Sequence, residues 1–498
     1  MKKIPALFLC AVLMLSACHA PQSPTAPPAQ ESPGQEQAQP ESIPFQLAVY
    51  DSYSLHPVLA ENRANLALSG LLYEPLFALN DRFEPEGVLC ENWMVSPDGL
   101  VWTFTLRGGI TFSDGTPLTA EIAANALNTA RTAPSRYVSR LRDITSVSGE
   151  GLTLTVALTA PNGNLPALLD IPIALDDTQR PAGTGCYVLR EEDGQLSLTA
   201  RTDWWQNKPL PVDTIPLKCV TRADELILSF ESGDVALVDV DLMGTNALGY
   251  SGSYETWDYA TTSMLYLGFN TASGLCRSAQ VRQALALAID RESIAQVDYA
   301  RHAAASTLPV HPDSPLYDRE KAAVLAYDPE ALSLRLDELK LTGRALTLLV
   351  NSENAARVSA ANRLAQQLRW TGLEVTVEKL AFEDYTAALE QGKFDLYLGE
   401  VVLSADFDLS PLLLPGAPLN YGRWQNDAFA PLLAQTRASQ GVLRSIHAND
   451  LWELLSQEVP IAPICFKNGC LLTRWGRLSG AQPVRGNVFY HLEGWNIA

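Results

Sequence analysis

Residues 345–377 contain a strand, a helix and a second strand in immediate succession, and this order constrains the fold more than any other feature. Residues 345–350 form an apolar run that predicts a strand, 355–370 have the spacing of an amphipathic helix, and 373–377 alternate as a strand does. Gly372 predicts the end of the helix. Strands joined in this way pair in parallel through a right-handed crossover. The order therefore predicts an α/β fold.

Other segments repeat this mixture of strands and helices. Residues 101–106 predict a strand on which Trp102, Phe104 and Leu106 share the buried face, because every second side chain of a strand points the same way. The apolar run 394–403 predicts a buried strand. The α/β class therefore extends over most of the chain, and we find no internal repeat.

Two helices have recognisable starts. A serine or threonine side chain at the first position can accept a hydrogen bond from the backbone of the first turn. Thr119 therefore predicts the N-cap of a helix that runs to Ala130. Ser278 predicts the N-cap of a second helix, whose apolar face holds Val281, Leu285, Ala288 and Ile289.

The N-terminus predicts an export signal rather than part of the fold. The lysines at positions 2 and 3 supply a positive region, and residues 4–15 an apolar segment too short to span a bilayer. The following Leu15-Ser16-Ala17-Cys18 resembles the lipobox of bacterial lipoproteins. That resemblance implies that residues 1–17 are a lipoprotein signal peptide and that Cys18 receives lipid. Loss of the two lysines changes the net charge to −20 − 2 = −22.

The segment that follows predicts a tether. Residues 18–42 are rich in Pro, Gln, Glu and Ser and have almost no large apolar side chains, which is typical of a disordered linker. No later segment offers an uninterrupted apolar run of membrane-spanning length. We therefore expect a folded body that a lipid holds to the cell membrane on its extracytoplasmic face, at the cell surface or in the periplasm.

Charge and composition exclude some classes of protein. The 498 residues include 56 acidic and 36 basic ones, and the net charge of −20 disfavours nucleic-acid binding, which needs clustered Lys and Arg. The hydrophobic content of 47% provides for a large core in two or three packed units. The charge suits a protein that meets neutral or cationic small ligands.

The cysteines leave the disulfide pattern open. Beyond the signal and the lipidation site there are six, which allow fifteen complete pairings in an exported protein. Cys465 and Cys470 flank Lys467-Asn468-Gly469, whose Asn-Gly is a hairpin turn signal, so a bridge across a hairpin is one reading. The other hypothesis is that these cysteines are free and buried.

Catalytic and cofactor motifs are weak. Gly183-Thr184-Gly185 lacks the third glycine of a dinucleotide fingerprint, and the chain has no P-loop and no nucleophile elbow. Asp406 and Asp408 stand too close in the chain to face each other across a glycosidic bond. The histidines have no spacing typical of a metal site. We expect neither an enzyme nor a cofactor.

An ordered series of motifs resembles the bacterial extracellular solute-binding proteins that serve oligopeptide, dipeptide and nickel importers. The series spans about residues 47–475, nearly the whole body. Its members are Leu72-Tyr73-Glu74-Pro75-Leu76, Glu91-Asn92-Trp93 with Pro97-Asp98-Gly99, Trp102 to Arg107 with Phe112 to Glu121, Gly183 to Tyr187, Trp204-Trp205 with Pro209, and Asn270 with Val281 to Leu285 and Ala288 to Arg291.

This resemblance implies a two-lobed α/β fold of the periplasmic-binding-protein type (type II, cluster C). Lobe 1 would comprise residues 43–262 and 470–498, with an extra subdomain at about 77–170, and lobe 2 residues 263–469. Strand crossings near 264–270 and 461–472 would act as hinges. The implied function is that of a monomeric extracytoplasmic receptor of an ABC importer, which delivers a peptide or similar small solute to a permease with ATPase subunits.

The resemblance also implies a contact with the ligand. In peptide-binding members, a carboxylate within an Ala-Asp-aromatic segment pairs with the amino terminus of the peptide, and Ala405-Asp406-Phe407 matches that segment. Such pairing is chemically suitable, because a desolvated ammonium needs charge-assisted hydrogen bonds. Asp408 is the second acidic candidate, although it suits the start of a helix at Ser410-Pro411. Val402 and Leu403 stand where those members carry Gly-Trp, so the solute stays open.

Aromatic side chains are the remaining candidates for the walls of the cleft. They are Phe407, Tyr421, Trp424, Phe112, Tyr50, Tyr73 and Tyr266. Two alternatives to a peptide receptor remain. One is a metal-chelate binder like the nickel members, which would use His302, His311 or His56. The other is an enzyme or a sensor without transport.

Overall fold

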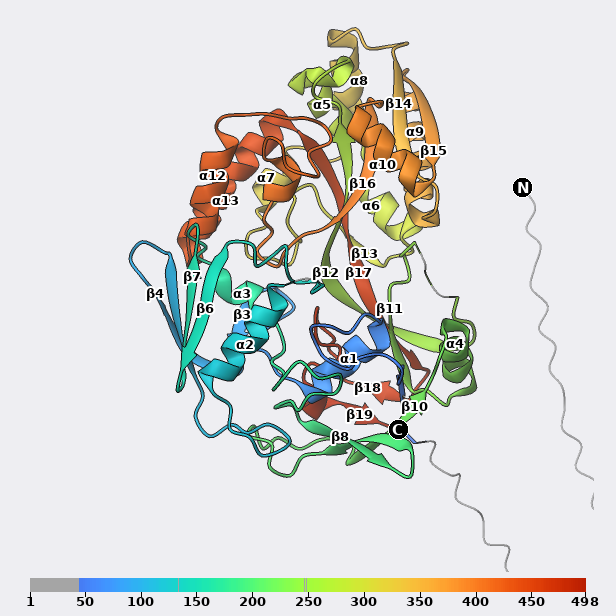
Figure 1. The fold of residues 1–498 in the computed structure, drawn as a ribbon. Coiled ribbons are helices and arrows are strands. Elements are labelled where there is room, and N and C mark those ends of the chain that lie inside the picture. Colours follow the sequence, from blue (N-terminus) through green and yellow to red (C-terminus); the bar gives the residue numbers. More distant parts are fainter. Residues whose placement is uncertain (1–43, 133, 246, 248) are drawn as a thin grey trace, which may run out of the picture. The chain divides into compact units, whose positions relative to one another are not determined.

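The computed structural model describes residues 44–498 except 133, 246 and 248, and Figure 1 shows its fold. The predicted signal peptide, the lipidation site Cys18 and the tether lie outside these residues. Residues Ile43–Ala498 form one compact unit. Within the described part of the chain, none of the helices combines the length and the apolar character that crossing a bilayer demands.

The predicted strand–helix–strand unit is confirmed. β14 (Ala345–Asn351) and β15 (Glu374–Leu380) pair in parallel, and α9 (Ala355–Trp370) connects them. The side chain of Asn354 accepts a hydrogen bond from the first turn of α9. Gly372 follows the helix with φ +91°, a conformation that glycine adopts without strain. Local chain chemistry thus sets both ends of this helix.

The unit belongs to a mixed sheet with the strand order β11-β17-β12-β16-β14-β15. The other strands of this sheet are β11 (Leu237–Val240), β12 (Tyr254–Phe269), β13 (Ala303–Ala305), β16 (Leu396–Val402) and β17 (Ile461–Arg474). Alternate residues of β14 enter different cores, because Leu348 packs on one face of the sheet and Leu349 on the other. Burial on both faces explains why these strands are continuous apolar runs.

Helices cover both faces of this sheet (Figure 1). One core packs beneath α5 (Ala279–Ala286), α8 (Pro329–Glu338) and α9. The opposite core packs against α10 (Phe382–Gln391), α12 (Phe429–Ala438) and α13 (Gly441–Glu458). The shorter helical segments near the sheet are the 3-10 turn Leu275–Arg277, α6 (Arg291–Ser293), the π turn Ile294–Asp298, α7 (Arg319–Ala323) and α11 (Ser410–Leu413).

β12 and β17 are long antiparallel neighbours that run through two different surroundings. The first section of β12, Tyr254 to Tyr259, pairs with the last section of β17, Gly469 to Arg474, beside β11. Beyond an irregularity between Tyr259 and Ser263, β12 pairs with β16, and β17 pairs with β13. This break lies at the predicted boundary between the lobes, which falls between residues 262 and 263. The division into two lobes itself stays a prediction.

Two further sheets lie on the β11 side of this break. One has the order β1-β10-β9-β8, with β1 (Leu47–Val49), β8 (Tyr187–Glu192), β9 (Gln195–Ala200) and β10 (Thr214–Cys219). The other has the order β4-β5-β7-β6, with β4 (Cys90–Val95), β5 (Val101–Leu106), β6 (Ile144–Glu150) and β7 (Thr153–Leu158). This part also contains helices α1 (Arg63–Leu72), α2 (Ala120–Ala130), α3 (Leu165–Leu168) and α4 (Ala223–Ser232). It further contains the two-stranded sheets β2 (Phe77–Leu79)–β3 (Pro85–Gly87) and β18 (Leu478–Ser479)–β19 (Asn496–Ile497), and the 3-10 turn Leu492–Gly494.

The β4–β7 sheet bears out the predicted pattern of β5. Trp102, Phe104 and Leu106 are all buried, and they pack under α2. Thr119 caps α2 as predicted, because its hydroxyl accepts a hydrogen bond from Ile122 N at 3.4 Å. Ser278 precedes α5, but its side chain makes no capping bond. The structure therefore confirms Ser278 as the residue before the helix, but not a capping hydrogen bond to its hydroxyl group.

The predicted hairpin between Cys465 and Cys470 is wrong. Both residues lie within the single strand β17, and they are free thiols, as are the other described cysteines. Pairing with β12 on one side keeps the Asn468-Gly469 segment extended. A Cβ on Gly469 would lie 2.1 Å from the Tyr259 ring, so close packing explains this glycine better than a turn does.

Candidate functional site

A cavity of about 570 Å³ lies between the predicted extra subdomain and the predicted lobe 2. Its walls come from residues 136–143, 401–419, Leu168 and two isolated arginines, Arg437 and Arg485. Three other large cavities, of about 460, 520 and 590 Å³, are lined only by residues of predicted lobe 1. Of these four cavities in the described part of the chain, the 570 Å³ cavity, called the arginine cavity below, has walls from both parts.

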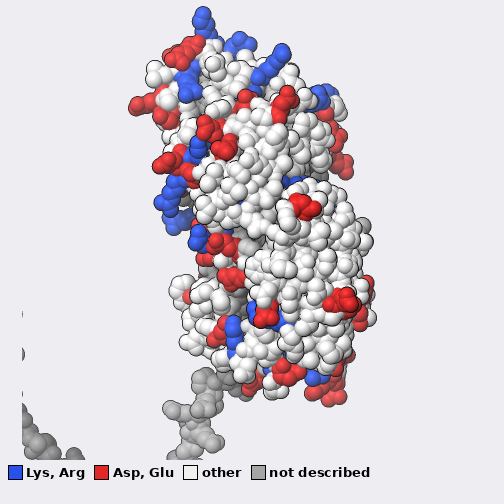
Figure 2. Space-filling model, turned by 90° about the vertical axis from the view of Figure 1, so that its left-hand side faces the viewer, with Lys and Arg blue, Asp and Glu red and all other residues white. Residues whose placement is uncertain are grey.

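The arginine cavity has the opposite charge balance from the whole chain. Its lining includes Arg136, Arg140, Arg142, Arg437 and Arg485, against Asp143, Asp406 and Asp408. On the face drawn in Figure 2, acidic and basic side chains are interspersed and much of the surface is uncharged. An excess of arginine is thus concentrated at this cavity although the net charge of the chain is −20. Such a site favours a ligand that carries a carboxylate or another anion.

Among the cavity arginines that form an ion pair, Arg140 is the most deeply buried. Its side chain is 7% exposed and lies 2.6 Å from Asp170, which also binds Arg485 at 3.0 Å. The Arg140 guanidinium also stacks 4.5 Å from the centre of the Tyr137 ring. Among the described residues, Nε of Arg140 finds no hydrogen-bond acceptor. A buried donor without a partner is costly, so a shift of this side chain that brings Nε to a ligand oxygen would be favourable.

Asp408 and Arg437, both in predicted lobe 2, bind residues of the predicted extra subdomain. Asp408 accepts a hydrogen bond from Arg142 at 2.5 Å and lies 3.9 Å from Arg437 Nε. Arg437 in turn donates to Asp143 at 2.5 Å. These pairs join residues 142–143 of the predicted extra subdomain to residues of predicted lobe 2, so they hold the two sides of the arginine cavity together.

The environment of Asp408 favours its charged form. Burial acts to raise its pKa, but the Arg437 charge, the hydroxyl and amide of Ser410 and the Arg142 charge together hold the pKa below its usual value. Both Ser410 groups donate to Asp408 Oδ1, at 2.5 and 3.0 Å, at the start of α11. This is the turn-and-helix role that the sequence suggested for Asp408.

Asp406 lies on the cavity wall and is 4% exposed. One carboxylate oxygen accepts a hydrogen bond from Asn162 at 3.0 Å, and the other accepts one from Ser404 at 2.5 Å. Its backbone carbonyl accepts a further bond from Arg444 at 2.7 Å. A carboxylate oxygen can accept two bonds, so each oxygen keeps capacity for a ligand ammonium.

The predicted aromatic residues lie elsewhere. Phe112, Tyr73, Tyr266, Phe407 and Trp424 are buried in hydrophobic cores. Tyr421 is half-buried against Tyr397, and Tyr50 lines the separate cavity of about 460 Å³. None of these seven is among the residues that line the arginine cavity. Of the predicted ligand contacts, only Asp406 and Asp408 come together there, and the ligand-binding role of every predicted contact stays a prediction.

Sequence reasoning missed the arginines and Asn162. One signal was present in the chain, since Arg131, Arg136, Arg140 and Arg142 form a basic cluster in an acidic protein. Arg437 and Arg485 carry no such local signal, because the fold brings them in from distant segments.

The histidines considered for metal chelates do not reach the arginine cavity either. His56 is buried and accepts backbone hydrogen bonds from Val58 and Leu59, and His311 is buried beside Phe83 and Phe466. Burial lowers the pKa of both imidazoles, His311 to about 4. His302 lies near the break in β12, bound to Asp258.

Two of the motifs shared with the solute-binding proteins meet in the interior. Glu74 accepts hydrogen bonds from the indole nitrogens of Trp204 and Trp205, at 3.2 and 2.7 Å, and from Gln206 at 2.8 Å. A Cβ on Gly183 would lie 2.0 Å from Leu72 O, so the glycine lets the two segments approach. These motifs build the scaffold and lie outside the arginine cavity.

The chain matches the family model described as bacterial extracellular solute-binding proteins, family 5, over residues 84–416. Among curated relatives, it is 24% identical over 414 residues to the glutathione-binding protein GsiB of Shigella flexneri, covering 77% of this chain and 80% of that protein. It is 28% identical over 323 residues to a putative ABC transporter peptide-binding protein of Brucella ovis, covering 58% and 60%.

A solved structure extends the likeness to the fold. The ABC transporter substrate-binding protein CtaP of Listeria monocytogenes superposes with a TM-score of 0.73 at 19% identity, covering 92% of this chain and all of that one. The predicted α/β fold of the two-lobed periplasmic-binding-protein type is therefore confirmed.

Proposed function

The chain belongs to the bacterial extracellular solute-binding proteins of family 5, and from that premise we propose that it captures a short peptide or a similar zwitterionic solute in the arginine cavity. It serves as the extracytoplasmic receptor of an ABC importer and delivers the solute to a membrane permease and its ATPase subunits. It does so as a monomer and without chemical turnover.

The composition of the arginine cavity is the observation that carries this proposal. Arginine excess and the unpaired Nε of Arg140 suit a carboxylate, while Asp406 suits an ammonium. A zwitterion with both groups satisfies both walls of the cavity at once. Because Arg140, Asp406 and Asp408 are buried, charge-assisted bonds to them are stronger than the same bonds on the surface.

The relatives support the same class of solute. The proteins from Shigella and Brucella are named for binding glutathione and peptides. Glutathione and unblocked peptides carry both carboxylate and ammonium groups, which is the combination that the cavity favours.

Ligand binding would be coupled to closure of the two lobes. The pairs Arg142–Asp408, Arg437–Asp143 and Asn162–Asp406 all join predicted lobe 1 to predicted lobe 2, so they form only when the lobes approach. The irregular section of β12 between Tyr259 and Ser263 provides a hinge for this movement. A lipid on Cys18 and the tether of residues 18–42 would keep the receptor on the membrane close to its permease.

The proposal is tested by binding measurements on peptides with free and blocked ends. Calorimetry of the wild type is expected to show binding of unblocked short peptides and weaker binding when either end is blocked. Arg140→Gln should lower the affinity for a free carboxylate about 10- to 100-fold, the range of a charge-assisted hydrogen bond. Arg222→Gln is the control, because Arg222 is 75% exposed and its ion pair among the described residues is with its neighbour Asp224 on α4.

Mass spectrometry of small molecules that co-purify with the protein provides an independent check. Peptides or other zwitterions are the expected finding. Recovery of non-ionic sugars alone, or equal affinities of wild type and Arg140→Gln for every peptide, would overturn the proposal.

A further inference from the structure

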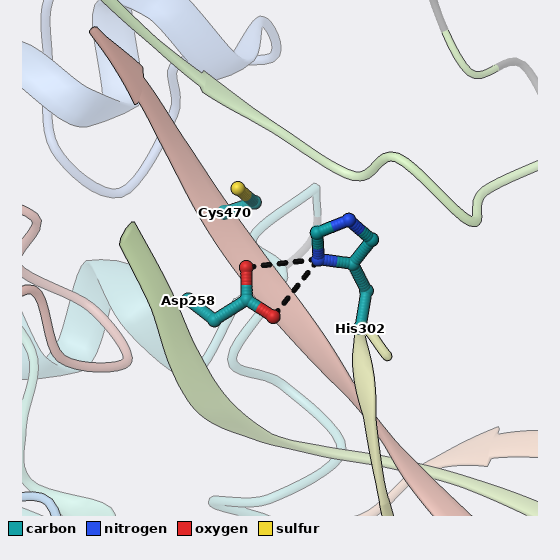
Figure 3. A group of neighbouring side chains, drawn as sticks. All are labelled: Asp258, His302 and Cys470. Carbon is teal, nitrogen blue, oxygen red and sulfur yellow. Dashed lines mark hydrogen bonds and ion pairs between the residues drawn. The ribbon is translucent and has the colours of Figure 1, made fainter. Parts of the chain in front are cut away.

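Three side chains with metal-ligating atoms meet at the break in β12, away from the arginine cavity. They are Asp258, His302 and Cys470, and Figure 3 shows the carboxylate and the imidazole facing each other beside the cysteine. The ligating atoms of the three all lie within 4.8 Å of one another. Neither the proposed solute site nor the scaffold motifs use these residues.

The fold holds the group together through backbone pairing. Asp258 on β12 and Cys470 on β17 are directly opposite in the antiparallel ladder, so their side chains lie on the same face of the sheet. His302 immediately precedes β13, and its carbonyl accepts a hydrogen bond from Asn468 N at 2.9 Å. His302 Nδ1 lies 2.9 Å from both oxygens of Asp258. The three ligands therefore come from three different strands or strand ends that are fixed relative to one another.

Exposure differs between the two sides of the group. The Asp258 and His302 side chains are 27% and 18% exposed, whereas Cys470 is 1% exposed. The sulfur thus forms a buried floor, and the carboxylate and imidazole form a rim open to solvent. A small ion can enter from the rim and reach all three atoms.

We propose that Asp258, His302 and Cys470 form a binding site for a divalent transition-metal ion, with zinc as the best fit. A set of one oxygen, one nitrogen and one sulfur ligand suits zinc and the neighbouring borderline metals, whereas calcium and magnesium prefer oxygen ligands. In tetrahedral zinc sites the ligand atoms lie about 2.0–2.3 Å from the metal and therefore about 3.3–3.8 Å apart. The 2.9 Å between His302 Nδ1 and the Asp258 oxygens is shorter than this spacing, and the whole group fits within 4.8 Å, so metal binding requires the side chains to rotate apart around the ion.

Binding would change the protonation of two ligands. The thiol of Cys470 releases its proton to solvent and binds as the thiolate. His302 binds through Nδ1 and carries its proton on Nε2. Water occupies the fourth position on the exposed side, as in zinc sites with three protein ligands.

The position of this site gives the metal a mechanical role. Asp258 and Cys470 belong to the strand sections beside β11, whereas His302 leads into β13, which pairs with β17 beyond the break. A bound ion would therefore tie together the strand sections on the two sides of the proposed hinge. We expect the metal to raise the melting temperature through mass action.

Cobalt(II) absorption of the full-length protein tests the assignment. Cobalt replaces zinc with the same ligands, and a sulfur ligand adds a charge-transfer band in the near ultraviolet. The wild type should show this band with one equivalent of cobalt, and zinc should displace it. Cys470→Ser should abolish the band, and His302→Gln should weaken cobalt binding at least tenfold.

Matched controls separate this site from chance binding elsewhere. Cys219→Ser removes an exposed cysteine, and His491→Gln removes an exposed histidine; both variants should bind cobalt like the wild type. Melting curves without metal show whether Cys470→Ser and His302→Gln are folded. His302 is partly exposed, so its variant keeps the test valid if the cysteine variant misfolds.

The outcomes are decisive in each case. Absence of the band in the wild type, or a band that survives Cys470→Ser, would overturn the proposal. Equal cobalt affinity of wild type and His302→Gln would overturn it as well. Failure here leaves the proposed solute site untouched, since peptide binding to the arginine cavity is measured without metal.

Discussion

Asp406 combines burial with a place on the cavity wall, and its two hydrogen-bond donors, Asn162 and Ser404, leave room for a ligand. The substitution Asp406→Asn preserves the shape of the side chain. An asparagine oxygen can still accept from Asn162, and its amide can still donate to Ser404. The variant should therefore fold normally while it loses the negative charge.

We predict that Asp406→Asn lowers the affinity for peptides with a free amino terminus about 10- to 100-fold, because a charged partner of the ammonium is lost. Calorimetry with each peptide and its N-acetylated form measures the effect. The N-acetylated forms should bind wild type and variant alike. Unchanged affinity for the free peptides would show that Asp406 has only a structural role.

Asp408 should make the stability depend on pH in the acidic range. Its pKa is lower in the folded protein than in the unfolded chain, so the stabilisation is present above the unfolded value and is lost as the pH falls through the folded one. Urea titrations of wild type and Asp408→Asn should give a constant difference in unfolding free energy between about pH 5 and 7 and a shrinking one below about pH 4.

The control for Asp408 is Asp224→Asn, which alters an exposed ion pair with Arg222. Exposed pairs contribute little to stability, so this variant should differ little from the wild type at any pH. A difference for Asp408→Asn that stays constant down to the lowest pH would contradict the prediction.

At the scale of single elements, the two helix starts allow a matched comparison. Thr119 and Ser278 occupy equivalent positions before α2 and α5, but only the Thr119 hydroxyl accepts a bond from its helix. Thr119→Ala should cost about 0.5–2 kcal/mol of unfolding free energy, the usual value of an N-cap. Ser278→Ala should change it by less than about 0.5 kcal/mol. Urea unfolding of both variants measures the difference, and equal costs would contradict the role of the hydroxyl.

Elements governed by local chain chemistry could be predicted from the sequence. The helix at 355–370 has a capping asparagine at one end and a glycine beyond the other, and the structure gives it the expected bounds. The prediction of a turn at Asn468-Gly469 was wrong, because pairing between distant strands outweighed the local preference for a turn. The glycine at 469 accommodates the Tyr259 ring, which is about 210 positions away in the chain, and no local pattern reveals such a contact.

At the scale of the whole molecule, the arginine cavity shows the limit of reading motifs. Ala405-Asp406-Phe407 led to one of its walls, but the aromatic candidates were chosen by residue type, and several proved to be core residues. The cavity depends on segments near 140, 405, 437 and 485 that only the complete fold brings together. The motifs therefore predicted the scaffold well and the lining of the cavity poorly.

The contact between the two predicted lobes can be tested at Gly163. A Cβ at this position would lie 2.2 Å from Ser439 O, and Gly163 N donates to Arg437 O at 2.7 Å. Gly163→Ala should keep the lobes from closing fully and lower the affinity for the solute at least tenfold, with little change in the melting temperature of the solute-free protein.

Gly108→Ala is the control for this variant. It lies in the same predicted subdomain, and its added Cβ would meet only Leu152 at 3.6 Å, an ordinary contact. Calorimetry and melting curves of both variants provide the comparison. Full affinity in Gly163→Ala would show that the close approach at this point is not needed for binding.

The arginine excess also bears on how a transporter avoids futile cycles. Even with Asp170 counted, the arginines of the cavity outnumber the nearby carboxylates by five to four. The ion pairs across the cavity balance most of these charges, and an anionic group on the solute would neutralise the net positive charge that remains in a region of low dielectric. The same charges that select the solute would thus make the closed form more stable with solute than without it, so that the closed shape marks a loaded receptor for the permease.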